Sequence, residues 1–509
     1  MTTTATRHHA SRPSSADSGG SSRLYIGQIA GIAAAFIALE LAVAARYGFH
    51  RDELYFLACA RHLAWGYVDQ PPLVPAVARM VVAVFGSSVV ALRFFPAIAG
   101  GTCIVLTACM ARELGGGRRA QLLSALAAAT SAQVLAADHL LSTAAFDLFF
   151  WSAITYLVLR LLHTGDERWW LAIGAVTGIG LLNKYNVAFL LFGLAVGLVG
   201  SGRARMLTSR RLWTGAAIAL AIWTPNLVWN AHHDWAAVAM LHSLHQENST
   251  LGASIGFIPA QILIVGPVLL LFWLAGLRRL LRHPFGRPLG LAYLTLLVLD
   301  VVTGAKPYYL GGIYFVLFAA GGLRLEERLA TSDRSPRRYA CLFVIGAIVA
   351  LPLTLPVLPV RALAKGPWEG NINKDLSATV GWEPFVHQLA GVVASLPPSQ
   401  RVHVVIFTGD YGAAGAVDLY GRRYGLPHAM SGHNSYWWWG PADATNDATT
   451  IAVNLPRDYL ETIFAKVVPA GSVNTPKGIW TEERGEPIWI CSKQKTTWAG
   501  AWPNAKHYG

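Results

Sequence analysis

Long apolar segments alternate with short charged loops over about the first 360 residues of the chain. Most of these segments have the length that a helix needs to cross the hydrocarbon core of a bilayer, and the loops between them are rich in arginine. The pattern predicts eleven membrane-spanning helices, at residues 24–45, 89–111, 120–138, 143–162, 169–183, 185–201, 212–229, 254–277, 288–305, 307–323 and 339–358.

One apolar segment, Pro71 to Gly86, is too short to count as a span. Its ~15 residues would reach roughly 22 Å as a helix, against a hydrocarbon core of about 30 Å. If it lies flat on the outer surface, every later basic loop falls on the cytoplasmic side, as the positive-inside rule requires. These loops are residues 112–119, 160–168, 203–211, 278–287 and 324–338. We therefore expect the N-terminus inside and the C-terminus outside.

The ends of the chain differ in character from the predicted spans. Residues 1–22 are rich in Ser, Thr and Gly and are typical of a disordered cytoplasmic tail. After about Val360, charged and turn residues return and apolar runs shrink to strand length. Residues 403–408 and 450–455 are predicted strands, and residues 413–424 form a predicted helix that ends before Gly425. We expect three parts: the tail 1–22, a membrane part 23–359 and a small extracytoplasmic α/β domain 360–509.

Composition agrees with a polytopic α-helical membrane protein. The chain is 54% hydrophobic and only 14% charged, and its mean hydropathy is +0.41, which excludes an ordinary soluble domain. The net charge of +13 lies mostly in the basic loops, so it does not indicate a nucleic-acid partner. The five cysteines have neither metal-ligand nor disulfide spacing.

The unusual polar residues of the membrane part gather near one predicted face. With the topology above, they lie at or near the outer ends of the spans or in outer loops: Asp52, Glu53, Asp69, Asp138, His139, Asp147, Lys184 and Lys306. Each has a simpler explanation on its own. Asp147 would cap a helix, Asp138 and His139 would be solvated in a loop, and the lysines would extend to the interface. As a one-sided set, however, they indicate a functional site.

These residue types suit the transfer of a group from a lipid phosphate to a hydroxyl. A carboxylate accepts the proton of the acceptor hydroxyl, and cations hold the phosphate as it leaves. The first outer loop, with the adjacent acids Asp52 and Glu53, is the expected centre of this site. Adjacent helical residues point about 100° apart, so the two acids cannot serve one atom equally.

Several motifs resemble bacterial family 39 glycosyltransferases, which are PMT-like enzymes of the GT-C superfamily related to protein O-mannosyltransferases and lipid A aminoarabinose transferases. The first loop is the most specific match. The motifs are Arg51-Asp52-Glu53-Leu54-Tyr55, Val68-Asp69-Gln70-Pro71-Pro72, His139-Leu140-Leu141-Ser142-Thr143 with Asp147, Leu182-Asn183-Lys184-Tyr185, Lys306-Pro307-Tyr308-Tyr309, and Gly421-Arg422-Arg423-Tyr424-Gly425 with the following Ser431 to Trp437.

The resemblance implies an inverting glycosyltransferase that takes a sugar from a polyprenyl-phosphate donor on the outer face of a bacterial cytoplasmic membrane. The base maps to Asp52. Glu53 would bind a sugar hydroxyl or be structural, and Asp138 rivals Asp147 as the second acid. Substrate-binding roles fall to Glu53, Tyr55, Asp138, His139, Asp147, Lys184, Lys306, Tyr308, Tyr309 and Trp437. No cofactor is firmly implied, and a divalent cation stays open because no metal-ligand spacing is present.

Two questions stay open from the sequence. The acceptor is a glycan, a lipid or a protein, and the Tyr436 to Trp439 run is either a stacking platform for it or an interfacial anchor. The alternative function is a polytopic transporter or a flippase of a lipid-linked sugar, which would place its site at the bilayer midplane between broken, repeated helices.

Overall fold

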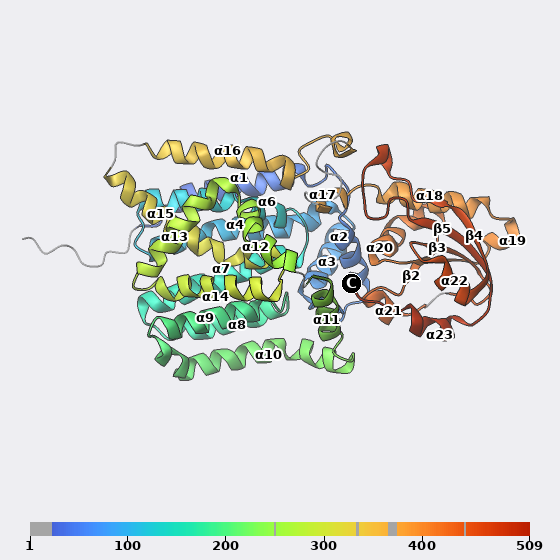
Figure 1. Cartoon of the computed structure of the whole chain (residues 1–509), viewed down its shortest axis with the longest axis horizontal. Helices are drawn as coiled ribbons and strands as arrows, with labels where there is room; N and C mark the ends of the chain where they lie inside the picture. The colour runs from blue at the N-terminus through green and yellow to red at the C-terminus, as the bar shows by residue number, and fades with distance from the viewer. Residues whose placement is uncertain (1–22, 249–250, 332–334, 365–373, 442–443) are drawn as a thin grey trace, which may run out of the picture.

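The computed structural model has two parts that lie side by side, a long helical bundle and a smaller part built on a β-sheet (Figure 1). It describes residues 23–248, 251–331, 335–364, 374–441 and 444–509. The predicted tail 1–22 lies outside these ranges. Three helices lie where the two parts meet: α2 (Arg51–Arg61), α3 (Leu73–Phe85) and α11 (Ala236–Asn248) (Figure 1).

The bundle follows the predicted apolar segments closely. Its helices are α1 (Ile26–Val43), α4 (Val89–Glu113), α5 (Arg118–Ala129), α6 (Ala132–Ala137), α7 (Thr143–Thr164), α8 (Trp169–Leu181), α9 (Val187–Gly200), α10 (Arg210–His232), α12 (Leu251–Val265), α13 (Leu270–Arg282), α14 (Arg287–Thr303), α15 (Tyr314–Ala330) and α16 (Pro336–Thr354), with the 3₁₀ turns η1 (Ala204–Thr208), η2 (Pro267–Leu269) and η3 (Pro307–Ile313).

The chain is a multi-pass membrane protein with a mostly helical fold. Among the residues that the structure describes, six helices are long and apolar enough to cross a membrane, or seven if one bent pair is counted as a span. The helices α8 and α9 are shorter, with 13 and 14 residues. At 1.5 Å per residue they reach about 20 Å, so they are as short as the sequence predicts.

All five predicted basic loops meet at one end of the bundle. Glu326 accepts hydrogen bonds from the backbone N–H groups of Gly117 and Arg119. The carboxylate of Glu113 pairs with Arg160 and His163. The remaining loops join through ion pairs and backbone contacts: Arg211 with Asp166, Arg203 with the carbonyl of Pro284, and His283 with the carbonyl of Leu114.

The contacts of Arg93 show that Pro71–Gly86 does not cross the bundle. Arg93, at the start of α4, donates to the carbonyls of Ala44 and Gly48 just after α1, so the chain leaves α1 and enters α4 at the same end. The helix α3 between them lies at the end of the bundle next to the sheet (Figure 1).

The predicted span at 254–277 is not one continuous helix. The segment is broken between α12 and α13, and the two halves of the pair meet at 94°. Gly266 has φ 108°, a conformation that favours glycine, and Pro267 begins the 3₁₀ turn η2. Glycine permits the reversal and proline donates no N–H to continue the helix, so the chain turns sharply here.

Two other predicted spans are also irregular. Residues 120–138 form α5 and α6, which are separated at Thr130 and Ser131, where the Ser131 hydroxyl donates to the carbonyl of Val265. Residues 307–323 begin as the 3₁₀ turn η3 before α15 starts at Tyr314. Serine and threonine hydroxyls compete with backbone hydrogen bonds, which favours such interruptions.

The five strands form one mixed sheet within the predicted extracytoplasmic part. They are β1 (Val404–Thr408), β2 (Ala429–Ser431), β3 (Thr449–Val453), β4 (Phe464–Ser472) and β5 (Pro487–Gln494), in the order β2-β1-β3-β5-β4. The first three pair in parallel, and β5 pairs antiparallel with β3 and β4. The predicted strands correspond to β1 and β3, whereas β2, β4 and β5 were not predicted.

Short helices complete this part of the chain. They are η4 (Val360–Ala364), α17 (Lys374–Ser377), α18 (Trp382–Ser395), α19 (Pro398–Arg401), α20 (Tyr411–Tyr420), η5 (Gly421–Tyr424), α21 (Ser435–Trp439), α22 (Arg457–Ile463), η6 (Pro476–Gly478), α23 (Trp498–Ala501) and η7 (Trp502–Ala505). The predicted helix 413–424 is α20 with its continuation η5, and it ends before Gly425 as expected.

The two parts are joined by close packing of α2 against α20. A Cβ atom on Gly415 would lie 2.9 Å from the backbone carbonyl of Leu54, and one on Gly412 would lie 3.0 Å from the Cβ of Arg51. Contacts at the far ends of the helices, Asp52 with Tyr411 and Arg61 with Asp418, show that the helices run in the same direction. The absence of side chains at the two glycines allows the backbones to approach, so the first outer loop is fixed to the sheet part.

Candidate active site

The His50-Arg51-Asp52-Glu53 sequence starts α2 with a reciprocal cap. The His50 side chain accepts a hydrogen bond from the Asp52 backbone N–H at 3.1 Å, and Glu53 Oε2 accepts one from the His50 N–H at 2.8 Å. Both acids therefore lie in the first turn, where the helix dipole favours negative charge. The cap fixes the direction of the Glu53 carboxylate.

Asp52 is the partly exposed acid of the pair. Its side chain is 41% exposed, and its Oδ1 accepts a hydrogen bond of 2.8 Å from the Tyr411 hydroxyl of α20. The Arg51 guanidinium lies 3.7 Å from the same oxygen and 5.4 Å from the centre of the Tyr411 ring. Arg51 also pairs with Glu482. One carboxylate oxygen is thus held by the sheet part, and the carboxylate keeps access to solvent.

Glu53 has a different environment. It is fully buried and accepts two hydrogen bonds from Arg93 of α4, at 3.0 and 2.7 Å. It also accepts from the backbone N–H of Leu141 at 3.1 Å and from that of His50. These contacts occupy both oxygens and favour the structural alternative for Glu53 over the binding of a sugar hydroxyl.

Arg93 connects Glu53 to a buried polar group inside the bundle. Its guanidinium donates to the carbonyls of Ala44 and Gly48 at 2.6 and 2.9 Å and lies 3.3 Å from His139 Nε2. The other nitrogen of His139 lies 3.0 Å from Glu40 of α1. His139 therefore belongs to a network that holds α1, α4 and the start of α2 together.

Asp138 and His139 do not form a solvated loop. Both are almost fully buried, and neither carboxylate oxygen of Asp138 has a hydrogen-bond partner within the described part of the chain. Asp138 Oδ2 lies so close to Gly100 that a Cβ atom there would approach it to 2.4 Å.

A second acid, Asp69, lies near Asp52. The Tyr55 hydroxyl donates to Asp69 Oδ1 at 2.9 Å and accepts from the backbone N–H of Ser435 at 3.2 Å. Burial raises the pKa of Asp69 to about 7, and the negative charge of Asp52 acts in the same direction. Tyr55 therefore connects the first loop to the sheet part through Ser435.

The predicted lysines lie at the same end of the bundle. The ammonium of Lys184 is 4.9 Å from the centre of the Tyr308 ring and 4.4 Å from that of Tyr309. Asn186 donates to Asp147 Oδ2 at 2.9 Å and to the carbonyl of Tyr309 at 3.2 Å. Ser142, not Asp147, caps α7. Lys184, Asp147, Tyr308 and Tyr309 are thus brought together as one group.

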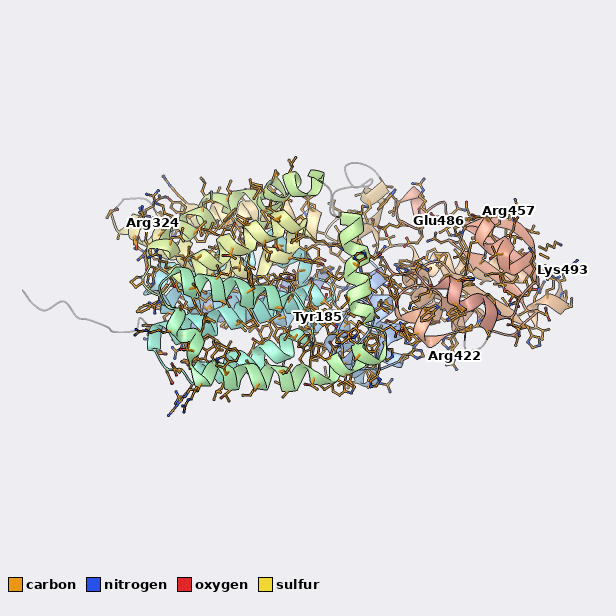
Figure 2. All side chains as sticks on the ribbon, turned by 60° about the horizontal axis from the view of Figure 1, so that its bottom comes forward. Tyr185, Arg324, Arg422, Arg457, Glu486 and Lys493 are labelled. Carbon is orange, nitrogen blue, oxygen red and sulfur yellow. The ribbon has the colours of Figure 1, made fainter. Side chains whose placement is uncertain are left out.

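Electrostatics connect Lys306 to the start of α2. The pKa of Asp375 in α17 is lowered, first by the neighbouring His50 imidazole and also by the positive charges of Arg51 and Lys306. His50 Nε2 lies 3.8 Å from Asp375 Oδ1. Tyr185, beside Lys184 in the chain, lies where the bundle faces the sheet part, whereas Arg324 lies at the far end (Figure 2).

Trp437 and Trp438 of α21 share Lys506 as a neighbour, whereas Trp439 packs elsewhere. Trp437 and Trp502 each donate an indole N–H to the backbone carbonyl of the other at 2.9 Å. Trp438 donates to the Tyr508 hydroxyl at 3.3 Å, and Trp439 stacks on His62 with ring centres 4.4 Å apart. They therefore do not form one continuous stacking platform.

Sequence reasoning missed Arg93, Tyr411 and Asp375. Arg93 carried a signal, because an ionisable residue inside an apolar segment indicates a buried partner or a function. Tyr411 and Asp375 lie in ordinary polar sequence and carried none. Among the residues that the structure describes, no three His, Cys, Asp or Glu side chains gather so as to hold a metal ion.

Comparisons with known proteins agree with this architecture. Residues 69–229 match the family model of dolichyl-phosphate-mannose-protein mannosyltransferases. The lipid A galacturonosyltransferase RgtD of Rhizobium johnstonii is 26% identical over 243 residues, which are 46% of this chain and 50% of that protein. The match thus spans about half the length of this relative.

Two crystal structures of ArnT from Cupriavidus metallidurans share the whole fold. The apo structure has a TM-score of 0.64 at 14% identity and covers 92% of this chain and 97% of that one. The structure bound to undecaprenyl phosphate has a TM-score of 0.60 at 15% identity and covers 92% and 98%. The chain therefore has an ArnT-like fold, and residues 69–229 are similar to the mannosyltransferase family.

The resemblance stated from the sequence is confirmed by the family match, the relative and the shared fold. The family match includes Asp69, Asp138, His139, Asp147 and Lys184, and begins after Asp52. At 14–15% identity, the likeness to ArnT shows the fold alone. The roles of Asp52, the lysines and the other site residues therefore stay predictions.

Proposed function

We propose that this GT-C protein is a membrane glycosyltransferase that moves a sugar from a polyprenyl-phosphate donor to an acceptor hydroxyl. The observation that carries the proposal is the setting of Asp52. A partly exposed carboxylate is held by Tyr411 at the junction of the two parts, at the same end of the bundle as Lys184 and Lys306. A base and nearby cations are the groups that this reaction needs.

Asp52 serves as the general base. Oδ1 is occupied by the Tyr411 hydroxyl, while Oδ2 has only the His50 imidazole at 3.8 Å as a described partner. Oδ2 accepts the proton of the acceptor hydroxyl as its oxygen bonds to the anomeric carbon. The bond from that carbon to the phosphate oxygen breaks on the opposite face, which inverts the configuration. Polyprenyl phosphate leaves with the electron pair.

Lysines stabilise the leaving phosphate. Lys306 is the first candidate, because its positive charge, like that of Arg51, lowers the pKa of Asp375. Lys306 therefore lies near the start of α2. Lys184, against Tyr308 and Tyr309, is the second. The departing polyprenyl phosphate is already a good leaving group, so charge stabilisation suffices and no general acid is required.

The donor class follows from chemistry and from likeness together. ArnT has been crystallised with undecaprenyl phosphate, and we extend that class of lipid to this chain. RgtD is named for action on lipid A, so a lipid-linked glycan is the acceptor we favour. A glycan or a protein hydroxyl is the alternative that the assay below separates.

The reaction takes place on the outer face of a bacterial cytoplasmic membrane. The five basic loops share one end of the bundle, and the positive-inside rule assigns that end to the cytoplasm. The candidate site and the sheet part lie at the other end (Figure 1, Figure 2).

The transporter or flippase alternative has one point in its favour, the broken pair α12–α13. Transporters place their substrates at such breaks. Near this break, however, Gln261 donates to the carbonyl of Pro307 and accepts from the Tyr314 hydroxyl. The acids and lysines of the site lie elsewhere, at the end of the bundle, which favours the transferase.

The test is turnover of a radiolabelled undecaprenyl-phosphate sugar by purified protein with lipid A, a glycan or a Ser/Thr peptide as acceptor. Asp52→Asn removes the proton acceptor but keeps shape, so turnover should fall by roughly 10²–10⁴-fold with little change in donor binding. Asp458→Asn, on the exposed helix α22, is the matched control. Labelled donor that crosses vesicle membranes without bond cleavage would instead identify a flippase.

A further inference from the structure

A cavity of about 270 Å³ lies at the opposite end of α2 from Asp52. The end of α2 supplies Arg61 and His62, α20 supplies Asp418, and the sheet part adds His428, Tyr436 and Trp439. Its volume is close to the lower limit for small-ligand pockets, so it suits one ring-sized group. None of the roles assigned above uses this cavity.

The only carboxylate among these six residues is already satisfied. Asp418 Oδ1 accepts from the Ala429 backbone N–H and lies 3.1 Å from His428 Nδ1, and Oδ2 accepts from the Tyr436 hydroxyl at 3.0 Å. Asp418 is also the nearest anion to Arg61, at 3.9 Å. The charged group left for a ligand is thus the Arg61 guanidinium, which is a donor and a cation.

Arg61 keeps most of its hydrogen-bonding capacity. Within the described part of the chain, its guanidinium donates one hydrogen bond, from Nη2 to the backbone carbonyl of Asp418 at 3.1 Å. A guanidinium has five N–H donors in a planar fork. The Arg61 side chain is 40% exposed, so a carboxylate or phosphate can reach it in the bidentate geometry that Arg favours.

Aromatic rings form the other wall. Trp439 and His62 are stacked, with ring centres 4.4 Å apart and planes 15° from parallel, and Tyr436 lies edge-on to Trp439 at 4.6 Å. Flat rings beside hydrogen-bond donors suit a sugar ring, which presents apolar C–H faces and polar edges. A purely apolar ligand would leave the donors unpaired.

A row of packed rings connects this cavity to the proposed base. Tyr411, which holds Asp52, lies 4.8 Å from Tyr55, and Tyr55 lies 6.2 Å from Tyr436 of the cavity wall. Along α2, nine residues separate Asp52 from Arg61, about 14 Å at the helical rise. The cavity is therefore rigidly positioned at a distance that an extended oligosaccharide can span.

We propose that this cavity binds an acidic saccharide unit of the acceptor, several sugar units away from the hydroxyl that reacts. The inference rests on the proposed transferase function, because it assigns the bound sugar to the acceptor. It predicts that long acidic acceptors are favoured over short or neutral ones, and that the preference weakens as salt increases.

The test is binding by the full-length Asp52→Asn protein in nanodiscs, with trigalacturonate as the acidic probe and maltotriose as the neutral one. Titration calorimetry should show tighter binding of trigalacturonate, and His62→Ala or Arg61→Gln should raise its dissociation constant at least tenfold. The matched controls His387→Ala and Arg423→Gln alter an imidazole and a guanidinium elsewhere on the sheet part and should leave it unchanged. Thermal unfolding verifies that each variant folds.

The outcomes separate this inference from the proposed function. If the active enzyme transfers sugar but His62→Ala and Arg61→Gln bind trigalacturonate as the unaltered cavity does, the cavity is not a saccharide site. Failure of the Asp52→Asn protein to bind trigalacturonate overturns the inference as well. If both variants lose binding but the protein with Asp52 intact transfers no sugar, the cavity binds saccharide and the transferase proposal fails. Equal affinity for the two probes would overturn the acidic preference.

Discussion

The Tyr411 hydroxyl donates a hydrogen bond of 2.8 Å to Asp52 Oδ1, although 359 residues separate the two in the chain. Asp52 belongs to the first outer loop of the membrane part, and Tyr411 begins α20 beside the sheet. The orientation of the proposed base therefore depends on both parts of the molecule.

Replacing Tyr411 by phenylalanine should lower turnover. The variant loses the hydrogen bond that orients the Asp52 carboxylate, and such a bond to a charged group is worth about 1.5–3 kcal/mol. Turnover should therefore fall by roughly 10- to 150-fold, with little change in donor binding. Tyr459→Phe is the control, because the Tyr459 hydroxyl has no hydrogen-bond partner in the described structure. Equal turnover by Tyr411→Phe and the unaltered enzyme would exclude this positioning role.

Breaking the Arg93–Glu53 pair should destabilise the fold strongly. Both side chains are at most 1% exposed, so Arg93→Met leaves a buried carboxylate without its partner, at a cost of about 3–5 kcal/mol. The exposed pair Arg457–Glu461 provides the comparison, since Arg457→Met should cost less than about 1 kcal/mol. Thermal unfolding in detergent measures both. A similar small loss for the two variants would contradict the structural role of Glu53.

Loss of the Lys306 charge should weaken donor binding. Lys306→Met keeps most of the apolar stem, and a charge-assisted bond to phosphate is worth about 1.5–3 kcal/mol. Titration with undecaprenyl phosphate should therefore show a dissociation constant about 10- to 150-fold higher. Lys466→Met, on the exposed face of β4, is the control. Unchanged affinity in Lys306→Met together with a loss in Lys184→Met would transfer the role to Lys184.

Asp69 should make stability depend on pH. Burial raises its folded pKa to about 7, whereas an unfolded aspartate titrates near pH 3.9. Between about pH 4 and 7, Asp69 keeps its proton in the folded state and has lost it in the unfolded state. The free energy of unfolding is therefore highest at the low end of this window and decreases as pH rises. Asp69→Asn should flatten the fall in melting temperature over that window. Burial also raises the pKa of Glu483 to about 7. The contribution of Glu483 to the fall in melting temperature should therefore remain both in the unaltered protein and in Asp69→Asn.

Much of the bundle could be predicted because apolar length determines which segments cross a membrane. The position of Pro71–Gly86 at the outer end of the bundle was also predicted from the sequence, since arginine-rich loops indicate the cytoplasmic side. The break at Gly266–Pro267 was missed, although glycine followed by proline is a local signal. The apolar segment 254–277 has the length of one span, and the prediction followed this length instead of the Gly-Pro signal.

The site could be predicted in part. Asp52 and Glu53 were recognisable as a pair, but their neighbours were not: one acid meets Tyr411 and the other Arg93. Such contacts depend on tertiary packing over hundreds of residues, which a single sequence does not record. The same holds for α21, where Trp437 and Trp438 share Lys506 and Trp439 stacks on His62 instead.

The close approach of α2 and α20 also has a consequence for biogenesis. Translation at 5–20 residues per second separates the synthesis of Asp52 from that of Tyr411 by roughly 20–70 s. During that interval the first loop has no α20 to pack against, because Gly412 and Gly415 do not yet exist as its partners. A nascent chain thus carries its reactive carboxylate without the group that orients it. The contact that orients the proposed base therefore arises only when the distal part docks.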